Sequence, residues 1–146
     1  MIRAEHITKS FDGRVVLDDI SIEFQTGKTN LIIGRSGSGK TVLLKCLVGL
    51  HAVDSGEIFY DDIRYTALGF KERKAIRKDI GMIFQSFNLL EQRTVLRNIC
   101  FPLEIAGVKR DEAQARAAEL LELVGLSDRA KAYPSQLSGG QKQRVA

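Results

Sequence analysis

The sequence has no tryptophan, only two prolines and two cysteines, and no long apolar run. Two cysteines in 146 residues do not make a disulfide framework, and since Cys46 and Cys100 both lie among apolar residues, we expect buried, reduced thiols. No apolar stretch approaches the ~18 residues that a membrane-spanning helix needs, and the first residues lack the apolar segment of a signal peptide. We therefore expect a cytoplasmic protein, which can still dock onto a membrane protein.

The overall amino-acid composition is typical of a single globular domain. Hydrophobic residues make up 44% of the chain and charged residues 27%, which argues against the disordered and low-complexity classes. Lys and Arg number 22 against 18 Asp and Glu, so the formal net charge is +4. This mild excess helps any polyanion to bind and selects none, and we expect no nucleic-acid partner. We interpret the basic residues between 71 and 78 as a solvated helix face.

The N-terminal half mixes strand-like and helical patterns. Apolar and polar side chains alternate on both sides of Asp12-Gly13, which predicts a hairpin within the first 24 residues. In a regular strand, Ile2, Ala4 and His6 share one face. The spacing of apolar residues predicts a helix, and short apolar runs predict strands. The helices are expected at residues 40–50 and 71–78, and the strands at residues 29–33, 57–60 and 80–84.

The composition changes near residue 86, and the second half is predicted to be helical throughout. Thr94 can cap a segment that runs to Ile105 and is bent or ended near Pro102. The clearest amphipathic helix covers residues 111–124, and Gly125 ends it. Its apolar stripe consists of Ala113, Ala117, Leu120, Leu121 and Val124.

Residues 34–41 read Gly-Arg-Ser-Gly-Ser-Gly-Lys-Thr and fit the pattern GxxxxGK[ST]. A triphosphate needs several converging donors, and small residues let backbone N–H groups supply them without Cβ clashes. The helix that starts here adds the partial positive charge of its N-terminus. Lys40 offers a full charge to the β- and γ-phosphates, and the Thr41 hydroxyl is a hard oxygen ligand for Mg²⁺. Val42 has no hydroxyl, although its amide can still donate.

A second motif lies near the end of the chain, where Ser138 stands in the position of a helix N-cap just before adjacent glycines. Together with the phosphate loop, this motif makes the chain resemble the nucleotide-binding subunit of ABC transporters over essentially all 146 residues. The motif residues are Leu137, Ser138, Gly139, Gly140 and Gln141.

The resemblance implies an α/β fold of the P-loop NTPase class. It implies that residues 1–86 form part of a RecA-like ATPase core with an N-terminal antiparallel β-subdomain. Residues 87–146 then form a helical subdomain that ends in the signature motif. The implied ligands are ATP and Mg²⁺. The implied partners are a second ATPase subunit in a head-to-tail dimer and a transmembrane permease, which places the protein peripherally on the inner face of the cell membrane.

The resemblance also implies roles for individual residues. Lys40 and Gln85 are the expected catalytic groups, Thr41 and Gln85 the expected contacts of Mg²⁺, and the signature residues 137–141 contact ATP held by the other subunit. Phe11 occupies the position of an aromatic that stacks on adenine. The full set of expected nucleotide contacts is Phe11, Gly34, Arg35, Ser36, Gly37, Ser38, Gly39, Lys40, Thr41 and Val42.

The resemblance has two parts. Residues 34–50 look like phospholipid (lipid-asymmetry) importer ATPases, whereas residues 80–103 and 133–146 look like methionine-importer ATPases, so the cargo stays open. The family's Walker B strand and switch histidine are not found among these residues, and His6 and His51 are interpreted as structural or surface residues. We therefore expect a fragment truncated before Walker B and hydrolytically incompetent by itself.

Two alternatives stay open at the level of sequence. One is a catalytically silent nucleotide-binding fragment, which best describes the biochemistry expected of these 146 residues. The other is an ABC ATPase that acts outside transport, in translation or DNA maintenance. The chain has no sustained heptads between Gln85 and Leu137, which argues against the DNA-maintenance type of ATPase that contains long coiled coils.

Overall fold

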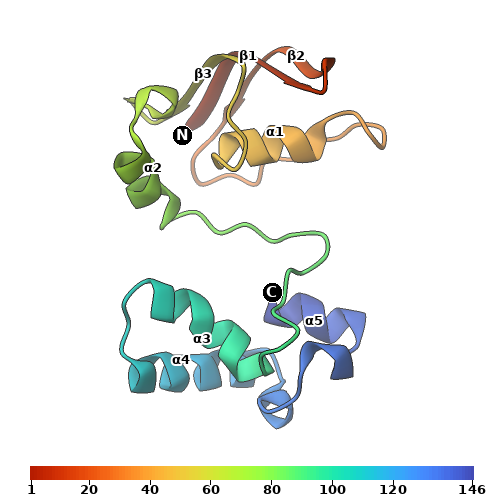
Figure 1. The fold of residues 1–146 in the computed structure, drawn as a ribbon, viewed down its shortest axis with the longest axis vertical. Helices are drawn as coiled ribbons and strands as arrows, with labels where there is room; N and C mark the ends of the chain where they lie inside the picture. Colours follow the sequence, from red (N-terminus) through yellow and green to blue (C-terminus); the bar gives the residue numbers. More distant parts are fainter. The chain divides into compact units, whose positions relative to one another are not determined.

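A computed structural model describes every residue from Met1 to Ala146 and shows two compact units, Met1–Ile80 and Gly81–Ala146. Their boundary falls earlier than the predicted division at residues 86 and 87. The first unit contains β1 (Ile2–Phe11), β2 (Arg14–Phe24), α1 (Lys40–Leu47), β3 (Ser55–Tyr60), β4 (Ile63–Arg64) and α2 (Phe70–Arg77) (Figure 1). The second contains α3 (Val95–Ile105), α4 (Arg110–Leu123) and α5 (Gly139–Val145), with short 3₁₀ turns between α4 and α5.

The four strands form one antiparallel sheet in the order β2-β1-β3-β4. The predicted hairpin is confirmed, because Phe11 pairs with Arg14 and leaves a two-residue turn between them. Asp12 (φ 48°) and Gly13 (φ 77°) both take positive φ, as the favoured hairpin turn requires at both central positions.

The side-chain alternation of β1 is interrupted at His6. The pairing of β1 with β2 shifts register between Ala4 and Ile7, where His6 (φ 51°) and Asp19 (φ 52°) leave the strand region. The His6 Nδ1 atom lies 2.7 Å from a carboxylate oxygen of Asp19. Because the irregularity moves the alternation by one residue, Ile7 joins Ala4 on the buried face and His6 is exposed. The predicted shared face of Ile2, Ala4 and His6 is therefore wrong.

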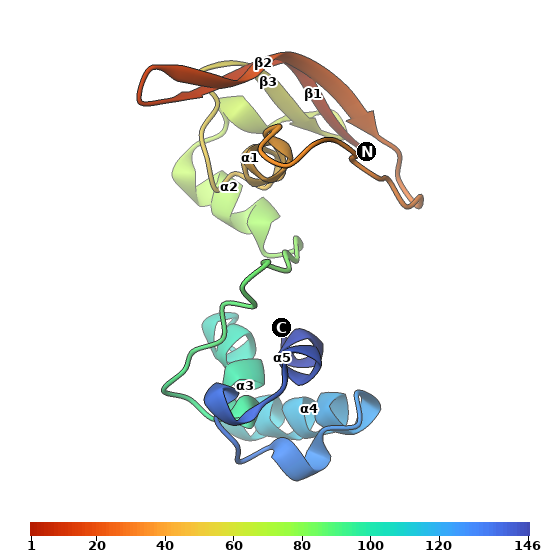
Figure 2. The same cartoon turned by 90° about the vertical axis from the view of Figure 1, so that its right-hand side faces the viewer.

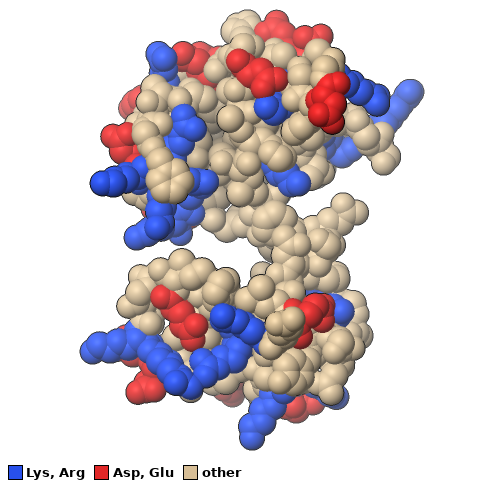
Figure 3. Space-filling model, viewed as in Figure 1, with Lys and Arg blue, Asp and Glu red and all other residues tan.

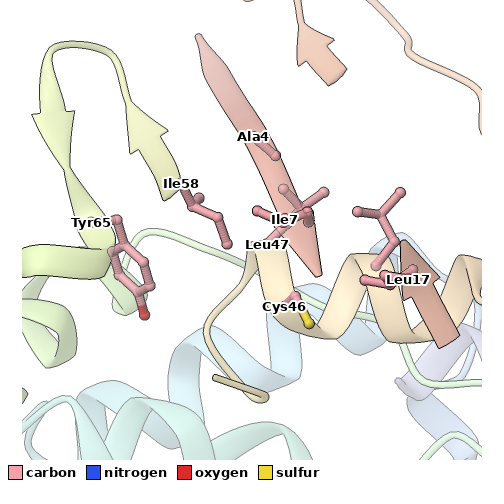
Figure 4. Packing of buried hydrophobic residues seen from close by; sticks show 8 residues of the cluster. Ala4, Ile7, Leu17, Cys46, Leu47, Ile58 and Tyr65 are labelled. Atoms are coloured by element: carbon pink, nitrogen blue, oxygen red, sulfur yellow. The ribbon is translucent and has the colours of Figure 1, made fainter. Parts of the chain in front are cut away.

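One face of the sheet packs on α1, which lies beneath the strands in Figure 2. Leu43, Cys46 and Leu47 of α1 are buried, with the i, i+3, i+4 spacing of one helix face. They form one core with residues of all the longer strands: Ala4, Ile7, Leu17 and Ile58, together with Tyr65 (Figure 4). The helix ends at Leu47, earlier than the predicted residue 50. This core fixes α1, and with it the loop that precedes α1, against the sheet.

Two predicted strands do not form. Residues 29–33 and 80–84 have no strand structure, and the sheet contains only β1 to β4. A strand is held by backbone hydrogen bonds to a neighbour, and neither segment finds one in this chain. Their apolar side chains are consequently exposed, with 79% of Leu31, 83% of Ile33 and 72% of Ile83 accessible.

The predicted strand at residues 57–60 is confirmed within β3, and the predicted polar helix at residues 71–78 is confirmed as α2. Lys and Arg side chains gather over α2 in Figure 3. Two of them are not purely solvated, because Arg73 donates to the Thr66 carbonyl and Arg77 to the Gly49 carbonyl. The α2 helix thus ties its own unit together as well as presenting charge.

The second unit is built on the packing of α3 against α4. Thr94 caps α3 by accepting from the Arg97 N–H, as predicted, and the helix continues past Pro102 to Ile105. Ala113 and Ala117 of α4 are fully buried, and their small side chains leave room for Cys100 of α3. Both cysteines are buried and free, and burial raises the pKa of each thiol. None of the helices combines the length and apolar character that crossing a membrane requires.

Candidate functional site

The phosphate loop, residues 34–41, leads directly into α1 on the first unit. Residues 34–38 are exposed, and the loop turns where the Ser38 N–H donates to the Arg35 carbonyl at 3.2 Å. Gly39 is the residue before the helix and has φ 86°. A Cβ at Gly39 would lie 3.0 Å from the Val16 carbonyl oxygen, so glycine lets the loop pass close to β2.

The N-terminus of α1 is uncapped. No side chain accepts from its first N–H groups, and its first turn contains no acidic residue. By contrast, Thr94 and Ser138 cap α3 and α5, and acidic residues occupy the first turns of α2 and α4. The first N–H groups of a helix have no acceptor within it, so at α1 they are available to an anion.

Lys40 is the first residue of α1 and folds back over the loop. Its Nζ atom donates to the Gly34 carbonyl at 2.8 Å and to the Arg35 carbonyl at 2.7 Å. These acceptors are neutral, and no carboxylate pairs with the ammonium group. The full positive charge of Lys40 therefore lies over a loop whose residues 34–38 are exposed, which suits a polyanionic ligand.

A cavity of about 180 Å³ lies at the start of α1. It is lined by Gly37, Ser38, Gly39, Lys40, Thr41 and Val42, with Val16 from β2. No sequence pattern marks Val16 as part of the site, because only the register of the hairpin brings β2 beside Gly39. The cavity brings together six of the predicted nucleotide contacts; Gly34, Arg35 and Ser36 lie in the preceding part of the loop.

The chemistry of the loop fits Mg²⁺ bound together with a phosphate. The Thr41 side chain is exposed at the first turn of α1 and offers one hard oxygen. No group of three or more His, Cys, Asp or Glu side chains in the structure could hold a metal ion. Mg²⁺ commonly takes few protein oxygens and completes its shell with phosphate and water, so one hydroxyl is a sufficient protein anchor beside a triphosphate.

Phe11 lies at the end of β1, and 38% of its side chain is exposed. The ring contacts His51 edge-on, with the two centroids 5.3 Å apart, and the Lys9 ammonium lies 5.3 Å from its centroid. A partly exposed aromatic ring held by neighbours can accept a stacked base. The adenine contact of Phe11 stays a prediction.

Gln85 lies on a turn at the start of the second unit and is exposed. The following residues, Phe87 (φ 63°) and Asn88 (φ 50°), both have positive φ, so the chain changes direction here. No hydrogen bond engages the Gln85 side chain. Its predicted contacts with Mg²⁺ and water stay predictions.

The signature residues form the start of α5. The Ser138 hydroxyl accepts from the Gln141 N–H at 3.3 Å, and the Gln141 carboxamide oxygen accepts from the Ser138 N–H at 2.9 Å. This reciprocal pair is a capping box and confirms Ser138 as the N-cap. Leu137 is buried with Val95, Leu121 and Leu126, whereas Ser138, Gly139 and Gly140 are exposed. The Leu137 side chain thus anchors the motif in the core.

Known proteins are similar to this chain over nearly its whole length. The family model described as "ABC transporter" matches residues 17–146. The chain is 51% identical over 149 residues to the methionine import ATP-binding protein MetN of Desulfitobacterium hafniense, covering 99% of the chain and 44% of that relative. It is 50% identical to MetN of Rhizobium johnstonii, covering 99% of the chain and 40% of the relative. The chain thus spans less than half the length of these two relatives.

Similarity to methionine importers therefore extends over both halves of the chain, and is not confined to residues 80–103 and 133–146. Among solved structures, the chain is similar to the ATP-binding cassette MJ0796 in a dimeric post-hydrolysis state bound to ADP and Pi. The TM-score is 0.88 at 34% identity, covering 99% of the chain and 66% of that structure. This similarity supports the predicted fold class.

Proposed function

The chain belongs to the ABC transporter family, and from this premise we propose that it is the ATP-binding part of a transporter subunit. The observation that carries the proposal is the uncapped N-terminus of α1 beside the ammonium group of Lys40. The triphosphate of ATP supplies the several anionic oxygens that these donors lack within the chain.

The proposed binding uses the backbone N–H groups of the loop, the Lys40 ammonium group and the Thr41 hydroxyl. The N–H groups of the loop and of the first turn of α1 bind the β- and γ-phosphates. The Lys40 Nζ atom exchanges the Gly34 and Arg35 carbonyls for phosphate oxygens, since a charged acceptor binds an ammonium more strongly than a neutral one. The Thr41 hydroxyl would hold Mg²⁺, which neutralises phosphate charge when bound. Phe11 stacks on the base.

In the whole protein, we propose hydrolysis of ATP with Lys40 and Gln85 as catalytic groups of this chain. Lys40 stabilises charge on the phosphates, and Gln85 orients the attacking water. The exposed Ser138, Gly139 and Gly140, with Gln141, contact ATP held by a second subunit in a head-to-tail dimer. The known cassette structure, which is dimeric, supports this arrangement.

The proposed partner is a transmembrane permease, which holds the protein at the cytoplasmic face of the membrane. The relatives named as methionine import ATP-binding proteins support an importer and make methionine the first cargo to test. Growth on limiting methionine, in a strain that depends on the whole protein and its permease, tests this part separately from nucleotide binding.

Competition for a fluorescent ATP analogue tests the binding proposal. In the presence of Mg²⁺, we expect ATP and inorganic triphosphate to displace the analogue from the 146-residue chain, and AMP to displace it at least about tenfold less well. The reason is that most of the charge-assisted hydrogen bonds, about 1.5–3 kcal/mol each, involve the terminal phosphates. Equal displacement by AMP and ATP would place the nucleotide elsewhere than in the phosphate loop.

A further inference from the structure

Four side chains of the first unit lie together where β1 ends. Lys9 and Phe11 come from the end of β1, and His51 and Asp54 come from the loop between α1 and β3. The Lys9 ammonium lies 5.3 Å from the centroid of the Phe11 ring, and the His51 ring meets it edge-on at 5.3 Å between centroids. These two neighbours cover part of the ring and leave 38% of the side chain exposed.

Asp54 fixes the end of β1 to the loop after α1. One of its carboxylate oxygens accepts from the Lys9 ammonium at 2.6 Å, and the other accepts from the Ser10 N–H at 2.6 Å. Its own N–H donates to the Thr8 carbonyl at 2.9 Å. The Lys9 and Ser10 donors hold the pKa of the Asp54 carboxyl below its usual value. The Lys9 side chain is 16% exposed and that of Asp54 43%, so the pair is shielded from solvent on the Lys9 side only.

The Ser10 N–H can reach Asp54 because the pairing of β1 with β3 ends at Thr8 and Ser55, next to Asp54. The register with β2 shifts between Lys9 and Ser10, two residues before the hairpin turn. Such irregularities change the direction of the side chains that follow. Asp54 therefore stabilises the local backbone that aims Phe11.

His51 in turn is fixed to α1. Its N–H donates to the Lys45 carbonyl at 3.1 Å, in the last turn of the helix. The N-terminus of the same helix carries Lys40 and the phosphate loop. A helix of eight residues is a rigid rod of about 12 Å. His51, which contacts the Phe11 ring, is thus attached to one end of α1, and the phosphate loop is attached to the other end.

We propose that His51, together with the Lys9–Asp54 ion pair, positions the Phe11 ring for the nucleotide base and so sets how much the base adds to binding. This inference rests on the proposed function and adds three residues to it. They are positioning residues, since they act on the base through Phe11. The sequence assigned His51 only a structural or surface role.

The test compares ATP with inorganic triphosphate as competitors of a fluorescent ATP analogue. In His51→Ala we expect the affinity for ATP to fall about three- to tenfold, the size of one aromatic contact, while the affinity for triphosphate changes less than about twofold. His51→Phe keeps an aromatic ring beside Phe11 and is expected to restore ATP binding. His6→Asn is the control, because the exposed His6 lies on another part of the hairpin and asparagine tolerates its positive φ.

Asp54→Asn tests the ion pair in the same assay, with the same expected selective loss. A parallel loss of ATP and triphosphate binding in His51→Ala and Asp54→Asn would show a general structural role and overturn the inference. Unchanged ATP binding in both variants would overturn it as well. If the unmodified chain binds neither ATP nor triphosphate, the proposed function itself fails. A selective loss of ATP binding in the variants can be observed only if the unmodified chain binds both ligands.

Discussion

Replacing Lys40 with alanine is expected to weaken the binding of ATP about 10- to 100-fold, which corresponds to losing about one charge-assisted hydrogen bond. Lys40 carries a full charge over the phosphate loop and has only the neutral carbonyls of Gly34 and Arg35 as partners. Its loss leaves the amides of the loop in place, so weak binding of the triphosphate should persist. Isothermal titration calorimetry with Mg-ATP measures the difference.

Lys45→Ala is the control for this prediction. Lys45 lies on the same helix, in its last turn, and its removal changes the net charge by the same amount. We expect Lys45→Ala to bind ATP within about twofold of the unmodified chain, because Lys45 lines neither the phosphate loop nor the cavity at the start of α1. If both variants lost affinity equally, net charge rather than the loop would account for binding.

Replacing Gly56 with alanine is expected to give a large loss of stability for a change of one methyl group. Gly56 has φ 83° in β3, and a Cβ there would lie 2.3 Å from the His6 carbonyl oxygen and 2.6 Å from that of Glu5. Both oxygens belong to the backbone of β1 and cannot move without disturbing the β1–β3 pairing. We expect a loss of about 3–5 kcal/mol in the free energy of unfolding, from strain and overpacking together.

Gly13→Ala separates the two causes. Gly13 also has positive φ, 77°, but a Cβ there would meet nothing within 4 Å. Its expected cost is about 1 kcal/mol, from backbone strain alone. Urea unfolding followed by circular dichroism measures both variants. Equal losses for Gly56→Ala and Gly13→Ala would contradict the close approach of β3 to β1.

Local signals in the sequence were sufficient for several elements. Asp12-Gly13 predicted the hairpin turn, and Thr94 and Ser138 predicted two helix starts, because each acts on neighbouring residues only. The pattern of the phosphate loop likewise predicted a turn followed by a helix, which the structure confirms at α1. These features depend on chemistry within a few residues of chain.

Features that depend on distant partners could not be predicted in this way. The irregularity at His6 lies where His6 and Asp19 both leave the strand region, and it moves Ile7 into the core. The apolar runs at residues 29–33 and 80–84 match strands in pattern, yet a strand also needs a neighbour. The contact of His51 with Phe11 depends on how the end of β1 meets the loop after α1. No pattern in the sequence indicates it.

The central claim is that the backbone amides of the phosphate loop, with Lys40, hold the terminal phosphates of ATP. Titration of the ¹⁵N-labelled chain with Mg-ATP, followed by amide NMR, tests it most directly. We predict that the largest shifts occur at residues 36–41 and that inorganic triphosphate reproduces them. Shifts that leave residues 36–41 unchanged while other amides respond would contradict the claim.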